Sequence, residues 1–330
     1  MSRRQLLNAP QDVIPEALEG LELTHPQLLR WDRESNLVLR RVPAAGKVGL
    51  ISGGGSGHEP LHAGFVGPGM LDVAVAGAVF ASPTALQIQT GTVAADSGRG
   101  VLQIVKNYTG DVLNFQIAAE LAADDDIEVK SVLVDDDIAT GSTQVGRRGT
   151  AAVVAVEKLC GAAAEEGADL SAVAQLGRRV IAQSRTLSLA LDACTHPGNS
   201  TPAFELPDDL VEFGVGIHGE RGVSRIPFAP ADDLISQLTD PLIGELDLRR
   251  GDVVIAIING LGAMYPLQLL VAARQVHRFL AGRGIVVARS LVGSYVTSLD
   301  MNGLSVTLLR TDDELVRLWD APVLTPALSW

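Results

Sequence analysis

Short runs of branched apolar residues alternate with alanine-rich stretches of helical spacing along most of the chain. This alternation limits the possible folds more than any other feature, because continuous apolar strands are typical of sheets covered on both faces. The predicted strands are Val48–Ser52, Leu71–Val75, Gly100–Lys106, Val129–Val134, Val211–Ile217, Asp252–Ile258, Ile285–Leu291 and Ser305–Leu309. The predicted helices are Asn114–Asp124, Thr150–Gly167, Leu170–Leu187, Pro266–Ala281 and Asp313–Asp320. The sequence therefore predicts an α/β fold of largely parallel or mixed β-sheets flanked by helices.

The length of 330 residues suffices for about two domains of ordinary size. The best boundary is the stretch Ala193–Pro207, which is rich in proline, glycine, serine and threonine. We therefore expect a first α/β domain over residues 1–190 and a second over residues 191–330. In such folds the functional residues follow the carboxyl ends of the strands.

Charge and composition exclude several classes of protein. A formal net charge of −13 without a cluster of Lys and Arg disfavours binding to nucleic acid or to an acidic membrane surface. An apolar content of 47% disfavours intrinsic disorder. The only cysteines, Cys160 and Cys194, lie in alanine-rich surroundings, which is typical of reduced structural thiols.

Two long uncharged stretches, Val73–Ala95 and Val253–Ala273, have the length of membrane spans. Glycine and proline interrupt both, so a strand, a loop and a helix are the better prediction for each. The N-terminal segment MSRRQLLNAPQD lacks the apolar core of a secretory signal. We therefore expect a soluble, cytoplasmic protein.

The strongest local signal is the segment SGGGSGH at residues 52–58, directly after a predicted strand. Glycine leaves the backbone N–H groups open, so that a small polar ligand can approach them closely. A tight turn needs only one or two glycines, and four of them favour a ligand-binding loop that presents His58. No Gly-Lys-Ser/Thr sequence follows, so the segment is not a nucleotide-binding P-loop.

Two segments resemble metal sites. His58-Glu59-Pro60-Leu61-His62 has the H-E-x-x-H pattern, but zinc binding by this pattern requires a continuous helix, and Pro60 fits a helix only in its first turn. The triplet Asp135–Asp137 follows a predicted strand, where it could attract Mg²⁺ or form a solvated turn that caps a helix. We predict no metal site in either segment.

Two further loops offer chemically useful side chains. His218 follows a predicted strand beside a glycine, and the formal G-x-G-x-x-G that contains it precedes a loop instead of the apolar helix of a dinucleotide site. The segment KNYTGD carries Lys106 and Asp111, which could supply a donor and a base to hydroxyl groups. Capping of the helix that begins near Asn114 is an equal alternative for Asp111.

Taken together, SGGGSGHEP, KNYTGD, DDD followed by GRRG, EFGVGIHGE, TSLDMNG and WDAPVLTPALSW resemble the substrate-binding subunit of dihydroxyacetone kinases. The resemblance runs from LLNAPQDVIPEALEGL near the start to Trp330. It implies a two-domain α/β subunit, usually a homodimer, that binds a short-chain ketose. The implied substrate-binding residues are Gly55, Ser56, Gly57, His58, Lys106, Asp111 and His218.

The resemblance also implies the chemistry of these residues. His218 attacks the carbonyl of dihydroxyacetone and holds the substrate covalently as a hemiaminal, while His58 and Asp111 activate its terminal hydroxyl group. The chain has no Walker loop, no kinase-type lysine motif and no clear Mg²⁺ cluster, so we expect it to bind no cofactor itself. A nucleotide-binding partner subunit, carrying ADP or ATP with Mg²⁺, would form dihydroxyacetone phosphate. The sequence leaves the donor open between ATP and a phosphoenolpyruvate-dependent phosphotransferase protein.

Two departures from the family pattern leave alternatives open. Arg221 stands where proline is more usual, and it would contact the product phosphate or face solvent. The region Asp232–Asp252 is shorter than in the longest relatives, which keeps a four-carbon ketose such as erythrulose as an alternative substrate. A coactivator paralogue that senses a ketose is a further alternative, although the presence of His58, Asp111 and His218 together favours the enzyme.

Overall fold

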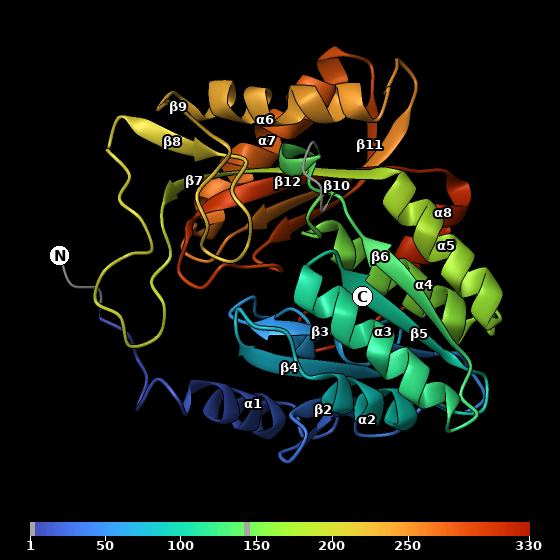
Figure 1. Ribbon diagram of the computed structural model, residues 1–330. Coiled ribbons are helices and arrows are strands. Elements are labelled where there is room, and N and C mark those ends of the chain that lie inside the picture. The colour runs from blue at the N-terminus through green and yellow to red at the C-terminus, as the bar shows by residue number, and fades with distance from the viewer. Residues whose placement is uncertain (1–3, 142–145) are drawn as a thin grey trace. The chain divides into compact units, whose positions relative to one another are not determined.

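The computed structural model describes residues 4–141 and 146–330, so the first three residues of the N-terminal segment lie outside it (Figure 1). The helices are α1 (Val13–Thr24), α2 (Ala85–Ala95), α3 (Thr109–Ala123), α4 (Ala152–Glu165), α5 (Leu170–Ala182), α6 (Ala231–Glu245), α7 (Pro266–Gly282) and α8 (Asp313–Asp320), with 3-10 turns η1 (Ala63–Phe65) and η2 (Ile138–Thr140). The strands are β1 (Leu29–Asp32), β2 (Leu37–Arg40), β3 (Gly49–Ser56), β4 (Val73–Val79), β5 (Val101–Lys106), β6 (Val129–Val134), β7 (Ser184–Asp192), β8 (Leu210–Phe213), β9 (Ser224–Pro227), β10 (Val253–Gly260), β11 (Val286–Gly293) and β12 (Asn302–Arg310).

The contacts divide the chain into two compact units, each built from separate segments. Unit 1 comprises Met1–Leu6, Asp135–Ala152 and Ile181–Val316, and unit 2 comprises Leu7–Val134, Val153–Val180 and Arg317–Trp330. The expected boundary at residue 190 therefore differs from the observed division. Its physical reason is β7, which spans residue 190 and pairs with both β12 and β8 inside unit 1.

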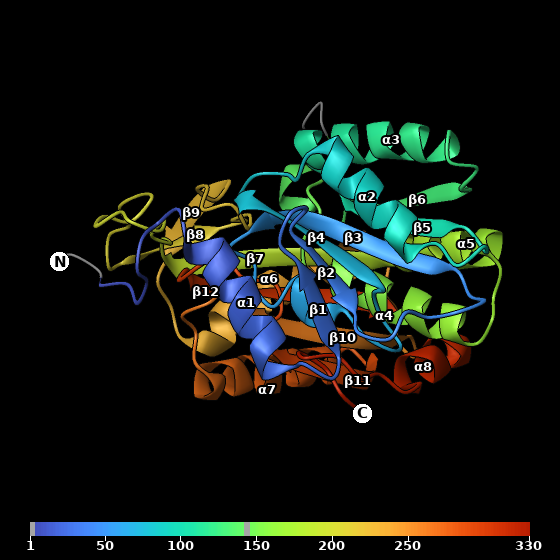
Figure 2. The ribbon, with the colours of Figure 1, turned by 90° about the horizontal axis from the view of Figure 1, so that it is seen from below.

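Unit 2 contains a six-stranded mixed sheet in the order β1-β2-β4-β3-β5-β6. The strands β4, β3, β5 and β6 run parallel, and β1 and β2 complete one edge in antiparallel pairing. Helices α2 and α3 pack against each other and against the strands of this sheet (Figure 2). Their contact surface includes Ile51, Val75, Val105 and Phe115, all of which are buried.

The alternation of side chains along β5 separates the two faces of this sheet. Val101 and Val105 join the core beneath α2 and α3. Because successive side chains of a strand point to opposite faces, Leu102, Ile104 and Lys106 lie on the other face. That alternation places the lysine at the carboxyl end of β5 among buried residues on the face away from α2 and α3.

Unit 1 contains a six-stranded mixed sheet in the order β11-β10-β12-β7-β8-β9. Only β10 and β11 pair in parallel among the described strands of this sheet, and the other pairs are antiparallel. Helices α6 and α7 lie side by side along the sheet, and their apolar faces form its core with β7, β10 and β12 (Figure 1). The predicted α/β fold with mixed sheets flanked by helices is confirmed.

Several predicted elements agree with the structure. The bounds of β6 and α8 are those predicted, and α7 ends one residue later than predicted. The stretches Val73–Ala95 and Val253–Ala273 each form a strand, a loop and the start or whole of a helix, as predicted. Among the residues that the structure describes, no helix is both long and apolar enough to cross a membrane.

The predictions for Leu170–Leu187 and for the glycine-rich segment were wrong in part. The predicted helix Leu170–Leu187 ends as α5 at Ala182, and the next residues begin strand β7, where β12 and β8 supply antiparallel partners. The glycine-rich loop was also wrong in its extent, because β3 continues as a strand through Ser56. Parallel pairing with β4 uses only backbone groups, so glycine does not prevent it.

Candidate functional site

The glycine-rich segment of unit 2 is a strand end followed by a turn. Ser56, the last residue of β3, donates its hydroxyl hydrogen bond to the carbonyl oxygen of Gly77 at 2.8 Å. Gly57 has a φ of 102°, a conformation that favours glycine, and begins the turn. Its backbone N–H donates to the carboxylate of Glu59 at 3.1 and 3.0 Å. The predicted ligand loop therefore starts at Gly57, after Gly55 and Ser56 have paired as strand residues.

Lys106 and Asp111 come together beside this strand end. Nζ of Lys106 lies 4.0 Å from Oδ2 of Asp111 and donates to the carbonyl oxygen of Gly53 at 3.2 Å. The other carboxylate oxygen of Asp111 accepts a hydrogen bond from the hydroxyl of Ser82. A Cβ atom at Gly54 would lie 2.5 Å from Nζ, so glycine is needed there to leave room for the buried ammonium. The structure thus joins two separately predicted segments, SGGGSGH and KNYTGD, around one cation.

Asp111 lies in the first turn of α3, which begins at Thr109. The prediction of a polar loop before a helix near Asn114 was therefore wrong in its position. The carboxylate is buried and close to the helix N-terminus, where the helix dipole stabilises negative charge. Both functions considered for this residue, a base for hydroxyl groups and a partner for the start of a helix, are compatible with this geometry.

His58 and His62 have different surroundings in the turn after β3. His58 is completely buried in the turn after β3, and its ring stacks on Phe80 with 5.1 Å between the ring centroids. His62 precedes η1, and its Nδ1 lies 2.6 Å from Oε1 of Glu157, while its Nε2 lies 2.7 Å from Nζ of Lys106. Both ring nitrogens of His62 are thus engaged within the protein. In the described ranges 4–141 and 146–330, no group of three or more His, Cys, Asp or Glu side chains could hold a metal ion.

Burial controls the protonation of the side chains around Lys106. Burial lowers the pKa of His62 well below its usual value, and the nearby charges of Lys106 and His58 lower it further. Burial also lowers the pKa of Lys106, although the carboxylates of Asp111 and Glu157 oppose this effect. For Glu157, burial raises the pKa well above its usual value, and Lys106 opposes the shift. The imidazole of His62 is therefore neutral at physiological pH.

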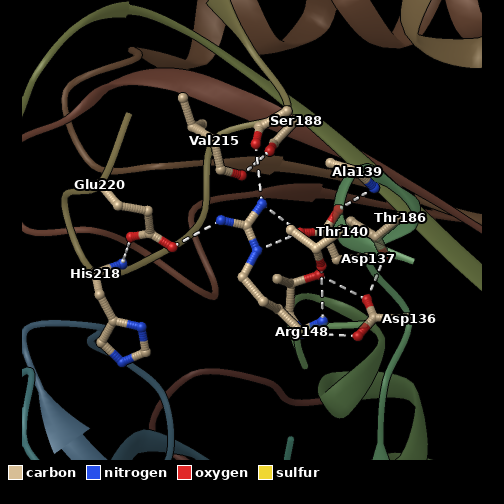
Figure 3. Close-up of polar contacts among 12 residues, drawn as sticks. Asp136, Asp137, Ala139, Thr140, Arg148, Thr186, Ser188, Val215, His218 and Glu220 are labelled. Atoms are coloured by element: carbon tan, nitrogen blue, oxygen red, sulfur yellow. Dashed lines mark hydrogen bonds and ion pairs between the residues drawn. The ribbon is translucent and has the colours of Figure 1, made fainter. Parts of the chain in front are cut away.

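His218 lies in unit 1, in a loop that begins earlier than predicted. Strand β8 ends at Phe213, and the half-buried His218 follows in the irregular segment after it. Its backbone N–H donates to Oε2 of Glu220 at 2.8 Å, and Oε1 of Glu220 accepts from Nη1 of Arg148 at 2.8 Å. Figure 3 shows the imidazole directed away from the Glu220 carboxylate. Glu220 thus holds the backbone of the loop, and the His218 ring points away from this contact.

Arg148 connects this loop to the rest of unit 1 (Figure 3). Its guanidinium pairs with Oδ2 of Asp137 at 2.6 Å and donates to the carbonyl oxygen of Gly214 at 2.9 Å. A Cβ atom at Gly216 would overlap the carboxylate of Glu220, so glycine is needed for the contact. Burial raises the pKa of Asp137 to about 6, against the opposing charge of Arg148.

Two residues of the aspartate triplet, Asp136 and Asp137, cap backbone groups inside unit 1. Asp136 is completely buried and accepts hydrogen bonds from the backbone N–H groups of Thr150 at 2.7 Å and Ala152 at 3.0 Å. Asp137 accepts from the N–H of Ala139 at 2.9 Å, in the first turn of η2. The helix-capping alternative describes these residues, but the turn that they form is buried instead of solvated.

The remaining predictions concern surface charge and thiols. Arg221 has a 52% exposed side chain and pairs with Oε1 of Glu212 at 3.3 Å. This position agrees with the solvent-facing alternative. Cys160 and Cys194 are both free and buried, as predicted for reduced structural thiols.

Sequence reasoning missed several residues that hold the site. Glu157 stands in a largely apolar helix next to a lysine, and a charged pair at such a position is a usable signal of buried ionic contacts. His62 was considered only as a zinc ligand. Arg148 and Glu220 lie within quoted segments, GRRG and EFGVGIHGE, but nothing in their spacing indicates that they pair.

The fold and the site define a two-unit α/β protein in which polar side chains lie at or after the ends of β3, β5 and β8. The sequence model of the Dak1 domain matches residues 19–327. The chain therefore belongs to the Dak1 domain family.

Similar proteins cover nearly the whole chain. It is 48% identical to the PTS-dependent dihydroxyacetone kinase 1, dihydroxyacetone-binding subunit DhaK of Listeria innocua, over 94% of this chain and 95% of that protein. It is 43% identical to the PEP-dependent dihydroxyacetone kinase, dihydroxyacetone-binding subunit DhaK of Escherichia coli, over 99% of both chains. A solved structure of the dihydroxyacetone kinase operon co-activator Dha-DhaQ matches with a TM-score of 0.92 and 32% identity, over 97% of this chain and 98% of that one.

Proposed function

We propose that this chain is the dihydroxyacetone-binding subunit of a dihydroxyacetone kinase, a phosphotransferase that acts through a partner subunit. The observation that carries the proposal is the 48% identity with a subunit of that name over 94% of this chain. Lys106 and Asp111 support this proposal, because a buried ammonium and carboxylate 4.0 Å apart can bind the hydroxyl groups of a ligand.

In the proposed capture step, one imidazole nitrogen of His218 attacks the carbonyl carbon of dihydroxyacetone. The electron pair of the carbonyl bond moves to oxygen, which takes a proton, and the imidazole gives up its N–H proton. The net result is addition of N–H across C=O, giving a hemiaminal that reverses readily because imidazole is a good leaving group. A polyol such as glycerol has no carbonyl and cannot react, so the step selects ketoses.

In the proposed transfer step, His58 and Asp111 are the two candidates to hydrogen-bond the terminal hydroxyl, and one of them accepts its proton as the oxygen attacks phosphorus. General-base help of this kind contributes about 10²–10⁴ in rate. Lys106 would donate a hydrogen bond to a substrate oxygen, and Gly55, Ser56 and Gly57 would line the pocket. Covalent capture would hold the attacking oxygen in a fixed orientation, which lowers the entropic cost of transfer.

The phosphate would come from a second protein. We propose a nucleotide-binding subunit that carries ADP or ATP with Mg²⁺, since phosphoryl transfer depends on cations at the phosphate. The names of the Listeria innocua and Escherichia coli relatives, PTS-dependent and PEP-dependent, support a phosphoenolpyruvate-dependent phosphocarrier as the donor, with ATP as the alternative. A cytoplasmic homodimer remains part of the proposal.

One reconstituted assay tests this function. The purified chain is mixed with a nucleotide-binding subunit and the phosphocarrier proteins, and dihydroxyacetone phosphate is measured with phosphoenolpyruvate or ATP as the donor. We expect product with phosphoenolpyruvate and none without this chain. A crystal soaked with dihydroxyacetone should show continuous density from the His218 ring to the carbonyl carbon. Absence of product with both donors would contradict the kinase function.

The co-activator with a TM-score of 0.92 supports a second candidate, a ketose-sensing regulatory subunit. The identities of 48% and 43% with two subunits named as parts of dihydroxyacetone kinases favour the enzyme. Ketose binding without product in the complete assay would favour the sensor. Erythrulose, tested beside dihydroxyacetone, would reveal a preference for a four-carbon ketose.

A further inference from the structure

Glu157, His62 and Lys106 form one continuous hydrogen-bonded chain inside unit 2. Nδ1 of His62 lies 2.6 Å from Oε1 of Glu157, and Nε2 lies 2.7 Å from Nζ of Lys106. The residues belong to α4, to the turn before η1 and to the end of β5. All three are buried, so each hydrogen bond is made in an environment of low dielectric constant, where it is strong.

The donors and acceptors fix the tautomer of His62. A lysine ammonium can only donate, so Nε2 of His62 must accept from Lys106. The imidazole hydrogen is then on Nδ1, where it points at the carboxylate oxygen of Glu157. A neutral imidazole therefore connects an ammonium to a carboxylate, as a bridge whose orientation both partners determine.

The surrounding charges favour the ionised form of this chain. Burial alone would neutralise both Lys106 and Glu157, since it lowers the pKa of the first and raises that of the second. Asp111, on α3, adds a second carboxylate near the ammonium, and His58 is the other titratable group that acts on His62. One cation between two carboxylates keeps its proton better than an isolated buried lysine does.

The same geometry leaves one N–H of Lys106 for a ligand. One N–H donates to the carbonyl oxygen of Gly53 at 3.2 Å and a second to His62 at 2.7 Å. Asp111 lies 4.0 Å away, beyond the distance of a direct hydrogen bond. Within the part of the chain that the structure describes, the third N–H has no acceptor in hydrogen-bond range. Gly54 lies beside Nζ and has no side chain, so residue 54 does not fill the space next to this N–H.

We propose that Glu157 and His62 are positioning residues that hold the Lys106 ammonium in place and direct its remaining N–H at an oxygen of the bound ketose. The identity of the ligand rests on the proposed function. The hydrogen-bonded chain does not, and it can be tested without any ligand.

The first test measures the tautomer in the full chain, which has 6 histidines, after selective ¹⁵N labelling of histidine. We expect His62, assigned by comparison with a His62→Gln sample, to carry its hydrogen on Nδ1. Its signals should stay constant through the pH range in which an ordinary histidine titrates, near 6.5. A hydrogen on Nε2, or titration in that range, would overturn the proposal whether or not the protein binds a ketose.

The second test removes the negative charge of Glu157. Glu157→Gln keeps an oxygen that can accept from His62, but Lys106 loses a counter-charge, so the pKa of Lys106 falls further. The alkaline limit of ketose binding, measured by calorimetry against pH, should move to lower pH by about one to two units. The matched control is Glu166→Gln, which removes a 45% exposed carboxylate paired with Arg317 and should leave that limit unchanged.

The third test breaks the bridge. His62→Phe keeps an aromatic ring but removes the acceptor, so ketose affinity should fall by about tenfold or more. His62→Gln restores an acceptor and should recover part of this loss, which a purely structural role would not predict. Folded variants at residues 62 and 157 with unchanged affinity and unchanged pH profile would overturn the proposal. If the unsubstituted chain binds no ketose, the proposed function fails, and the tautomer measurement still decides the hydrogen-bonded chain.

Discussion

The His218 loop of unit 1 and the surroundings of Lys106 in unit 2 use charged groups in opposite ways. The loop is held through its backbone by Glu220, which pairs with Arg148, and these side chains are 36% and 15% exposed. The ammonium of Lys106 is held through its own side chain by buried groups. Partly exposed ion pairs add little to the free energy of unfolding and are screened by salt. A buried charge that loses its partner lowers the stability of the fold much more. Unit 1 should therefore tolerate changes in its supporting charges better than unit 2.

The largest loss of turnover is expected when the imidazole of His218 is removed, because neither the Glu220–Arg148 pair nor the groups around Lys106 can form a covalent bond to the ketone. His218→Ala should lower turnover by about 10⁴ or more, because covalent capture and the orientation that it gives are lost. The preference for dihydroxyacetone over glycerol should disappear in competition calorimetry. An unchanged preference would show that the ketone is recognised without a covalent bond.

A smaller loss is expected at His58, which is held in unit 2 by stacking on Phe80. His58→Ala should leave ketose binding largely intact and lower turnover by about 10²–10⁴, since general-base help is lost. Calorimetry and the reconstituted assay measure the two quantities separately. Turnover equal to that of the unsubstituted protein would remove His58 from the mechanism.

Gly54→Ala tests how tightly the ammonium is confined. The new Cβ would lie 2.5 Å from Nζ of Lys106, so the ammonium must move away from its partners. We expect ketose affinity to fall about tenfold, as for a lost charge-assisted hydrogen bond. The control is Gly244→Ala in α6, where nothing lies within 4 Å. This change should leave affinity unaltered and raise the free energy of unfolding by up to about 1 kcal/mol.

Glu220→Gln tests the weaker support in unit 1. Gln still accepts from the N–H of His218 and removes only the negative charge of a partly exposed pair, so we expect turnover to fall only about two- to fivefold. The loss should diminish at high salt, where the original pair is already screened. A loss as large as that of His58→Ala would mean that unit 1 does not tolerate changes in its supporting charges better than unit 2.

The smallest effect concerns Asp137, whose pKa is raised to about 6 from an ordinary value of 3.8. The folded protein therefore takes up this proton more readily than the unfolded chain does. The contribution of Asp137 to the free energy of unfolding should decrease as the pH rises from about 4 to about 6, and it should stay constant above that range. Denaturant titrations of Asp137→Asn should lack this component of the pH dependence, and an identical pH profile would contradict the shifted pKa.

The sequence predicted the sheets better than it predicted the site. Strand β6 and helix α8 have the expected bounds because their residues combine a clear period with polar neighbours at both ends. The first four residues of β7 were assigned to a helix, because a run of Ser, Arg, Thr and Leu does not distinguish the two structures until its partner strands are known. The glycines of β3 were predicted to form a loop, but they form a strand, since pairing through the backbone outweighs their low preference for strands.

The predicted residues of the site came from motifs, and the missed ones from contacts between distant segments. Lys106 and Asp111 lie five residues apart in one motif, so local reading found both. Glu157 and His62 are separated by 95 positions, and no period or spacing relates them. The same holds for Arg148 and Glu220, which are 72 positions apart. Long-range ionic contacts of this kind are determined by tertiary packing, which a single sequence does not display.

The segmented construction of unit 2 has a consequence for how the protein is made. The segment Arg317–Trp330 belongs to unit 2 but follows all of unit 1 along the chain. In the finished structure the buried Lys158 of α4 donates to the carbonyl oxygen of Leu318 at 2.7 Å, and Pro68 accepts from the backbone of Leu324 at 2.9 Å. A ribosome delivers these partners only after unit 1 has been synthesised. Unit 2 is therefore completed only when the last segment of the chain has been made, and the buried amine of Lys158 has no Leu318 carbonyl to bind until then.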